Sequence, residues 1–346
     1  MMTLIKNLFT AFTLTLLAAC GGASDSQSAS TPAPMPEPAN ATAGMPEEQG
    51  VLAPIRVSGS YWIELSPVIV AANRYYPEQL EVGSGGITRI TSGEADIATN
   101  AETQLLRESL KNPDLRIIAT VTESFYRLVA RRSAGIETLA DLEGKRVMLP
   151  RNTSANYYLV AMLETVGLTE DDVTIVSLPP ATDDQTGMDR MSDALAAGDV
   201  DAISIWEPEP DDAIHALGDD AIVFQDRSVY REVFNLHARA PDLADPAKRA
   251  SIVAFLKALL DARDVLLADP EPLWPISAEV IPFNVEQIAA GWPEMEFPID
   301  IIPDMLDVLE REDKWVALET DREPRSREEL AVFIDPSPLA EAKAMR

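Results

Sequence analysis

Short apolar runs of strand length alternate with segments of helical spacing between residues 53 and 206. Strands are predicted at 55–57, 97–99, 115–121, 126–130, 145–149, 173–177 and 202–206. Helices are predicted at 65–73, 155–166 and 188–197. This alternation is typical of an α/β protein with mostly parallel sheets and helices on both faces.

The last third of the chain is predicted to be helical. Asp245 and Pro246 form an N-cap and a first-turn proline for a helix over 247–267. Its apolar positions recur at the spacing of a core-facing stripe, namely Ile252, Phe255, Leu256, Leu259 and Leu260. Further helices are expected near 301–312 and 328–333.

One segment of the chain is echoed 105 residues later. Residues 92–98 read Ser-Gly-Glu-Ala-Asp-Ile-Ala, and residues 197–203 read Ala-Gly-Asp-Val-Asp-Ala-Ile. In each copy, glycine ends a helix, an acidic residue follows and a short apolar strand begins. Such turns are common in α/β proteins, but two copies that each lead to a polar or aromatic cluster indicate two similarly built lobes.

The N-terminal segment has the features of an export signal. An apolar run at 8–19 follows Lys6 and ends in Leu-Ala-Ala-Cys-Gly, with Cys20 as the only cysteine of the chain. The run is short for a membrane span and has the length of a signal-peptide core. This pattern resembles the bacterial lipoprotein signal, so residues 1–19 are predicted to be cleaved and Cys20 to be lipidated. The alternative is an incidental cysteine in an N-terminal helix.

Residues 21–50 contain almost no large apolar side chains and are rich in Ser, Ala, Pro, Gly and Glu. Such a segment cannot bury enough apolar surface to offset the entropy lost on ordering. We therefore interpret residues 20–50 as the lipid anchor followed by a disordered linker.

The length and the charge of the chain limit its domain organisation and its possible partners. A chain of 346 residues is longer than one hydrophobic core usually holds, so a two-domain body is expected. The 57 acidic residues outnumber the 28 basic residues and give a net charge of −29. Nucleic acid is excluded as a partner, because phosphate backbones require a basic surface.

Several segments resemble one protein family in their order and spacing. They are Ile-Glu-Thr-Leu-Ala-Asp-Leu-Glu-Gly-Lys-Arg-Val at 136–147, the two echoed segments, the strand–turn–helix at 145–166, Trp-Glu-Pro at 206–208, and Phe-Ile-Asp-Pro-Ser-Pro-Leu at 333–339. Together they resemble the type II periplasmic solute-binding proteins of ABC importers. The most similar group serves nitrate, taurine, alkanesulfonates and thiamine-precursor pyrimidines (the NMT1/SsuA-like group).

The resemblance implies a hinged, two-lobed α/β fold. Lobe 1 would comprise 51–127 plus 234–346, and lobe 2 would comprise 128–233, with two chain crossings between them. Residues 78–86 are shorter than the family's usual turn and second strand. We therefore expect a shortened edge in the first lobe.

Ligand contacts are expected in the loops that follow the strands, where helix N-termini direct free amides into the cleft. The candidate residues from five loops are Ser60, Tyr61, Trp62, Thr99, Asn100, Thr122, Glu123, Ser124, Asn152, Thr153, Ser154, Asn156, Trp206 and Glu207.

Each candidate also has a structural interpretation. Ser154 is equally consistent with an ordinary N-cap, and Trp62 and Trp206 with core packing. Glu207 would attract an amine or a ring N–H, or it would pair with a neighbouring arginine. His215 and His237 lack metal-ligand spacing and are interpreted as surface or packing residues.

The sequence favours binding over catalysis. It contains no Gly-x-Ser-x-Gly elbow, phosphate-binding Gly-Lys-Ser/Thr loop, His-Glu-x-x-His motif or cysteine cluster. We expect no cofactor, no metal and a monomer that works with ABC permease subunits and is held to the membrane by its lipid. The ligand would be a sulfonate, a nitrate-like anion or a pyrimidine-type compound. A sensor or scavenger lipoprotein and a fold-related enzyme remain alternatives.

Overall fold

The computed structural model describes residues 52–181 and 186–346. Contacts divide the chain into two units, residues 1–49 and residues 50–346, and every described residue belongs to the second. The predicted signal peptide, the linker and Cys20 therefore lie outside the described residues.

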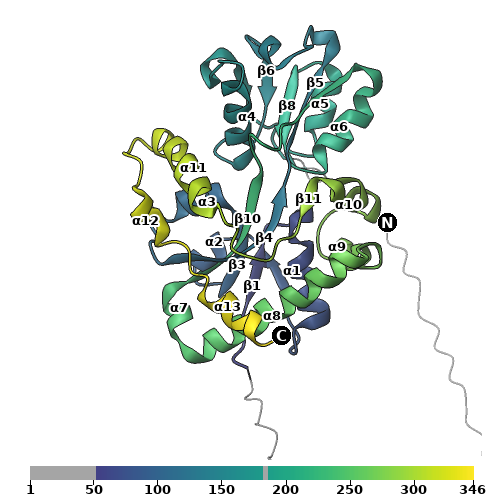
Figure 1. Ribbon diagram of the computed structural model, residues 1–346. Helices are drawn as coiled ribbons and strands as arrows, with labels where there is room; N and C mark the ends of the chain where they lie inside the picture. Colours follow the sequence, from purple (N-terminus) through teal and green to yellow (C-terminus); the bar gives the residue numbers. More distant parts are fainter. Residues whose placement is uncertain (1–51, 182–185) are drawn as a thin grey trace, which may run out of the picture. The chain divides into compact units, whose positions relative to one another are not determined.

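The first sheet combines strands from both ends of the described chain. Its strand order is β11-β4-β10-β3-β1-β2. The strands are β1 (Val57–Gly59), β2 (Val82–Ser84), β3 (Ile97–Ala101), β4 (Leu115–Ser124), β10 (Glu232–Arg239) and β11 (Met295–Glu296). The two longest, β4 and β10, lie side by side in the middle of Figure 1. The edge strand β2 has three residues, as the compressed segment at 78–86 predicts.

The second sheet uses only the middle of the chain. Its strand order is β7-β6-β8-β5-β9. The strands are β5 (Arg127–Arg131), β6 (Arg146–Met148), β7 (Thr174–Val176), β8 (Ala202–Ile205) and β9 (Ala221–Phe224). The chain enters this sheet through Phe125 and Tyr126 and returns to the first sheet through residues 225–231.

Each sheet has a parallel part and an antiparallel part. β1 pairs in parallel with β2 and β3, and β6 pairs in parallel with β7 and β8. β10 runs antiparallel to β3 and β4, and β5 runs antiparallel to β8 and β9. The predicted α/β class is confirmed, and the antiparallel strands β5 and β10 are those that follow a passage of the chain from one sheet to the other.

Helices lie on both faces of the sheets. In Figure 1, α4 lies on one side of the second sheet and α5 and α6 on the other. The α-helices are α1 (Ser66–Val70), α2 (Thr88–Thr91), α3 (Glu102–Glu108), α4 (Ser154–Glu164), α5 (Met191–Ala197), α6 (Glu209–Leu217), α7 (Ala240–Ala244), α8 (Pro246–Ala268), α9 (Trp274–Ala278), α10 (Val285–Gly291), α11 (Met305–Glu319), α12 (Arg327–Ala331) and α13 (Ser337–Ala344). Single turns occur at Ile63–Leu65, Ala71–Tyr75, Arg132–Ala134, Leu139–Leu142, Glu170–Asp172, Gly218–Asp220, Glu271–Leu273 and Trp292–Glu294.

The long helix α8 follows its sequence signals. The Asp245 carboxylate accepts hydrogen bonds from the amides of Ala247 and Lys248, and Pro246 occupies the first turn. The apolar stripe predicted for this helix is buried in the core of the first sheet. The predicted N-cap and the core-facing side of α8 are therefore confirmed.

The echoed segments fold into the same structure. Gly93 and Gly198 both adopt left-handed backbone angles, with φ of 76° and 81°, which residues with a Cβ rarely adopt. Asp96 then accepts hydrogen bonds from the backbone N–H of Arg56 (2.8 Å) and from its guanidinium. Asp201 accepts the same set from Arg146, with a backbone N–H distance of 2.9 Å.

We name each of these units an aspartate clamp, made of a strand-preceding aspartate and the arginine beside it. In the first clamp, Asp96 just before β3 is bonded to Arg56 just before the parallel strand β1. In the second clamp, Asp201 just before β8 is bonded to Arg146 at the start of the parallel strand β6. The same hydrogen bonds in two sheets support two similarly built halves.

Buried side chains form a continuous cluster that reaches from the second sheet to α3 and α11. At this junction the Gln104 amide donates to the Asn152 carbonyl (3.1 Å), and the rings of Tyr157 and Trp315 lie 5.4 Å apart. The elements around the two sheets are thus in direct contact beside the strand ends.

Candidate ligand-binding site

A cavity of about 250 Å³ lies where strand ends of the two sheets meet. Its lining comes from the segments that follow β1 and β8, from the end of β3 and the first turn of α3, from the starts of α4 and β10, and from the segment before α5. The lining residues are Ser60, Trp62, Glu64, Asn100, Ala101, Gln104, Thr153, Ser154, Met188, Trp206, Glu232 and Phe234. Ligands of open α/β sheets bind in this position, outside the carboxyl ends of the strands.

Six of the predicted contact residues line this cavity: Ser60, Trp62, Asn100, Thr153, Ser154 and Trp206. Trp62 and Trp206 meet edge to face, with ring centroids 5.3 Å apart. Trp62 also stacks on Phe283, with ring centroids 5.5 Å apart. Two indoles from distant parts of the sequence therefore form one aromatic wall.

Other predicted contacts lie behind the lining. Thr122 and Ser124 are buried in β4, and both hold Glu64: the Thr122 hydroxyl donates to its carbonyl (2.8 Å) and the Ser124 hydroxyl donates to its Oε1 (3.1 Å). Thr99 is fully buried in β3 and does not line the cavity. These side chains support the wall from within the sheet.

The predicted asparagines at the start of α4 organise the turn. The backbone N–H of Asn152, at φ 62°, donates to Asn156 Oδ1 (3.2 Å), and Asn156 Nδ2 donates to Glu170 Oε1 (3.3 Å). Thr153, with extended angles, is the N-cap residue, and Ser154 is the first residue of the helix. Asn152 and Asn156 shape the backbone there, whereas Thr153 and Ser154 line the cavity.

Three predicted contacts turn away from the cavity. The Tyr61 hydroxyl donates to the Val82 carbonyl (2.7 Å) at a different surface hollow. Glu123 pairs with Arg231. Glu207 is buried and pairs with Arg127 at 2.7 Å, so the arginine interpretation of Glu207 describes this structure.

Two acidic residues of the lining were not among the predicted contacts. Glu64 follows β1 in a single helical turn, and Glu232 begins β10. Their side chains are 1% and 5% exposed. An acidic residue at the start of the apolar stretch 63–72 was the available signal for Glu64, whereas Glu232 carried none that distinguishes it from a surface residue.

Neither carboxyl is fully paired within the part of the chain that the structure describes. Oε2 of Glu64, Oε2 of Glu232 and the indole N–H of Trp206 are buried and lack a hydrogen-bond partner there. Burial raises the pKa of Glu64 to about 7, and nearby Glu207 adds to the effect. Burial, together with Glu64 and Glu102, raises the pKa of Glu232 well above its ordinary value.

Behind Glu232 lies a network of buried acids and tyrosines. The Tyr230 hydroxyl donates to Glu102 Oε1 (2.9 Å), and the Val233 amide donates to Glu102 Oε2 (2.8 Å). Burial raises the pKa of both Glu102 and Glu312. Arginine and lysine are absent from the cavity lining formed by residues 60–234, so the described lining is acidic.

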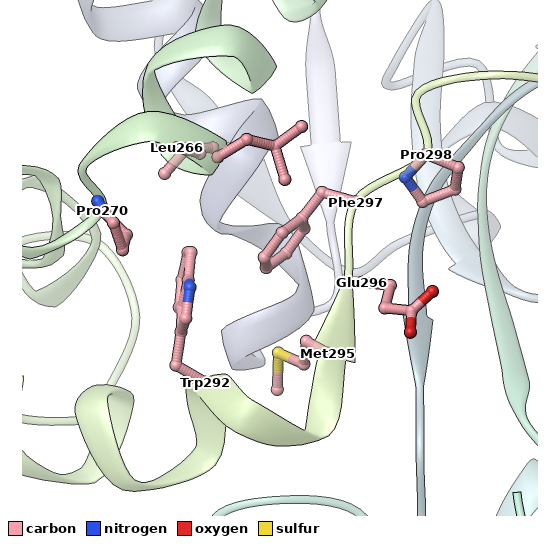
Figure 2. A pocket seen from close by; sticks show the side chains of 8 residues that line it. Leu266, Pro270, Trp292, Met295, Glu296, Phe297 and Pro298 are labelled. Carbon is pink, nitrogen blue, oxygen red and sulfur yellow. The ribbon is translucent and has the colours of Figure 1, made fainter.

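A larger cavity of about 460 Å³ lies elsewhere, between the end of α8 and β11. Figure 2 shows its apolar side chains, with Glu296 as the one charged residue among those labelled. None of the predicted contact residues lines it. Convergent polar groups mark a specific site better than size, so the smaller cavity is the candidate.

The described residues 52–181 and 186–346 contain no helix long and apolar enough to cross a membrane. Within the same ranges, no group of three or more His, Cys, Asp or Glu side chains is arranged to hold a metal ion. His215 is exposed beside Asp211, and His237 is buried in β10 against the Ala98 carbonyl.

A family model described as NMT1/THI5 like matches residues 79–272. This match covers more than half of the chain. The chain belongs to the NMT1/THI5-like family. The family resemblance inferred from the order of the segments is thereby confirmed.

Curated relatives of this NMT1/THI5-like chain are binding proteins. The taurine-binding periplasmic protein of Escherichia coli is 24% identical over 229 residues, which are 64% of this chain and 65% of that protein. A putative binding protein of Brucella abortus is 32% identical over 94 residues, 27% of this chain and 26% of that protein. The chain thus matches less than two thirds of the length of these relatives.

Solved structures share the fold of this family member. The periplasmic aliphatic sulphonate binding protein SsuA of Escherichia coli has a TM-score of 0.64 at 15% identity, covering 79% of this chain and 95% of that one. The desulfurization enzyme DSZB has a TM-score of 0.57 at 16% identity, covering 84% of this chain and 99% of that one. The two-lobed fold of type II periplasmic binding proteins is confirmed, and binding proteins and an enzyme both use it.

Proposed function

We propose that this protein is the extracytoplasmic solute-binding lipoprotein of an ABC importer. The observation that carries the proposal is the cavity at the strand ends, lined by an aromatic pair and polar groups from both sheets. Binding proteins among the curated relatives support a solute-binding role.

Capture of the ligand would involve closure of two lobes, residues 51–127 plus 234–346 and residues 128–233. The strand content of the two sheets supports this division, with β10 beginning two residues before the second proposed boundary. Hinge closure is the usual way in which such proteins bury a ligand. The cavity volume of about 250 Å³ lies below the ~300–1,000 Å³ typical of drug-sized ligands, which favours a small ligand such as a single ring.

The ligand classes for the first screen come from the relatives and from the site. Taurine and sulfonates are named for relatives, and the aromatic wall favours a pyrimidine-type ring. We expect one class to raise the melting temperature of the purified protein, because a ligand that binds only the folded state stabilises it by mass action.

Two tryptophans give a matched test of the location. Trp62 and Trp292 are both half-buried, but Trp62 lines the candidate cavity and Trp292 lines the cavity of Figure 2. We expect Trp62→Ala to abolish the thermal shift and Trp292→Ala to preserve it. The opposite result would move the site to the Figure 2 cavity, and no shift with any class of compound would count against solute binding itself.

Lipidation of Cys20 is the second part of the proposal. Labelled palmitate should enter the protein in a bacterial host, and the protein should partition into the detergent phase of Triton X-114. Cys20→Ser should remove both properties, because it removes the thiol that would carry the lipid. Equal labelling of the variant would refute the anchor. Permease and ATPase genes beside this gene would support transport over a sensor or scavenger role.

A further inference from the structure

The acidic lining of the cavity identifies the chemistry of its ligand. We propose, resting on the proposed solute-binding function, that the cavity binds a small ligand that presents N–H donors, as an organic cation or an aminated ring, to Glu64 and Glu232, and that it rejects a free anion. The proposal names the ligand class and the two residues that select it.

The cavity lining has hydrogen-bonding capacity that the described residues leave unsatisfied. Buried polar atoms are normally hydrogen-bonded, because an unpaired one costs about 1–3 kcal/mol. Within residues 52–181 and 186–346, Glu64 Oε2 and Glu232 Oε2 have no such partner, and both line the cavity. Each atom accepts when its carboxyl is ionised, and a bound cation or N–H donor favours that ionised form, so a donor supplies the partner that both atoms lack.

The charge around the two carboxyls also favours a ligand that is a cation or an N–H donor. The charged groups that act on the two carboxyls are acidic: Glu207 raises the pKa of Glu64, and Glu64 and Glu102 raise the pKa of Glu232. Arg127 is paired with Glu207 and does not line the cavity. A sulfonate or nitrate ion would enter a lining without a positive side chain among the described residues, and each ionised carboxyl there would repel it.

Neighbouring side chains surround the two acceptors, Glu64 and Glu232. Ser124 and Thr122 hold Glu64 from inside the sheet, and the hydroxyls of Tyr126 and Ser154 lie beside Glu232. The Tyr126 and Ser154 hydroxyls are themselves 2.9 Å apart. The indole pair beside these acceptors offers an apolar, electron-rich surface, which suits a flat ring or a cation.

The test uses isosteric variants with a matched control. Glu64→Gln and Glu232→Gln keep size and one acceptor, and glutamine at 64 can still accept from Ser124. Glu209→Gln is the control, because Glu209 is 4% exposed, has an unpaired Oε2 within the described residues and does not line the cavity. The probes are benzylammonium as an aromatic cation, 4-aminopyrimidine as an aminated ring, and ethanesulfonate and nitrate as anions.

Calorimetry of the purified protein should detect binding of the cation or the aminated ring. Each cavity variant should weaken that binding roughly ten- to hundredfold, the loss expected for a hydrogen bond to a charged group, and Glu209→Gln should leave it unchanged. Binding of benzylammonium should release protons at pH 7, measured by comparing buffers of different ionisation enthalpy, because the cation favours the ionised carboxyls.

The outcomes separate the two proposals. Binding of ethanesulfonate or nitrate with proton uptake, lost in Trp62→Ala, would overturn the ligand class and leave the solute-binding function intact. N–H donors that bind equally well to both glutamine variants would also overturn it. Absence of binding by all four probes and by the wider screen would reject the function together with the inference. Cooperative melting of each variant verifies that it is folded.

Discussion

At the scale of single residues, the two aspartate clamps differ in their surroundings. The Asp96 side chain is 4% exposed and has a second cation, Lys248, whose Nζ lies 2.9 Å from Oδ1. The Asp201 side chain is 13% exposed and is bonded mainly by Arg146. Burial opposes ionisation of Asp96, but Arg56 and Lys248 outweigh it and lower the pKa of Asp96 to about 2. The Arg146 hydrogen bond lowers the pKa of Asp201 as well.

We therefore expect the same substitution to cost more at Asp96 than at Asp201. Asp96→Asn removes the charge between two cations and should lower the free energy of unfolding by about 2 kcal/mol at pH 7, against about 1 kcal/mol for Asp201→Asn. Urea denaturation of the unliganded protein measures both. Equal losses would show that Lys248 adds nothing.

The pH dependence provides a check on this cause. A lowered carboxyl pKa stabilises the folded state above the ordinary value of about 4, and this stabilisation disappears as the pH falls toward about 2. The difference between wild type and Asp96→Asn should therefore shrink in that range. A difference that persists at pH 2 would mean that shape rather than charge is lost.

At the scale of elements, the sequence predicted the strands and helices whose local residue pattern agrees with their position in the fold. The apolar runs at 115–121 and 202–206 correspond to β4 and β8, and the capped helix at 247–267 corresponds to α8. β10 was not predicted, because its buried positions include polar residues. Asn235 accepts from the Thr120 hydroxyl (2.9 Å), and His237 Nδ1 meets the Ala98 carbonyl (3.2 Å), so neighbouring strands contribute a hydrogen bond to each of these polar side chains.

The same distinction applies to the site. Loops after parallel strands were predictable because strand ends converge, and Ser60, Asn100, Ser154 and Trp206 meet at one cavity. The positions of Glu64 and Glu232 in the lining were not, because acidic residues are usually exposed and these two are buried by tertiary packing. Tyr61 and Glu123 failed as lining residues since a strand-end loop faces several directions and sequence does not fix the rotation.

At the scale of the whole molecule, the acidic side chains fall into two groups, those at the surface and those that are buried. The net charge of −29 lies mostly at the surface, but Glu64, Glu207, Glu209, Glu232, Glu102 and Glu312 are buried. Burial raises the pKa of each of the six, to about 7 for Glu64 and about 8 for Glu209. The folded protein therefore binds protons at these six carboxyls more tightly than the unfolded chain does.

This difference sets the sign of the pH dependence. Between the ordinary glutamate value of about 4.5 and the raised values near 7 and 8, the folded state binds more protons than the unfolded state. The free energy of unfolding must then fall as the pH rises through this interval. We expect the unliganded protein to melt at a higher temperature at pH 5 than at pH 8.

Surface repulsion acts in the same direction and has to be separated from burial. Salt at 0.5 M screens exposed charges and leaves the buried carboxyls largely unaffected, so the fall in stability should persist in salt. Glu209→Gln should reduce the fall, since a neutral amide has no proton to lose, while Asp307→Asn at an exposed position should not. If salt abolished the pH dependence, surface repulsion would be its source, and an unchanged fall in Glu209→Gln would mean that Glu209 does not contribute to it. An N-H-donating ligand should flatten the same curve by pairing Glu64 and Glu232, which links the stability of the body to the occupancy of its cavity.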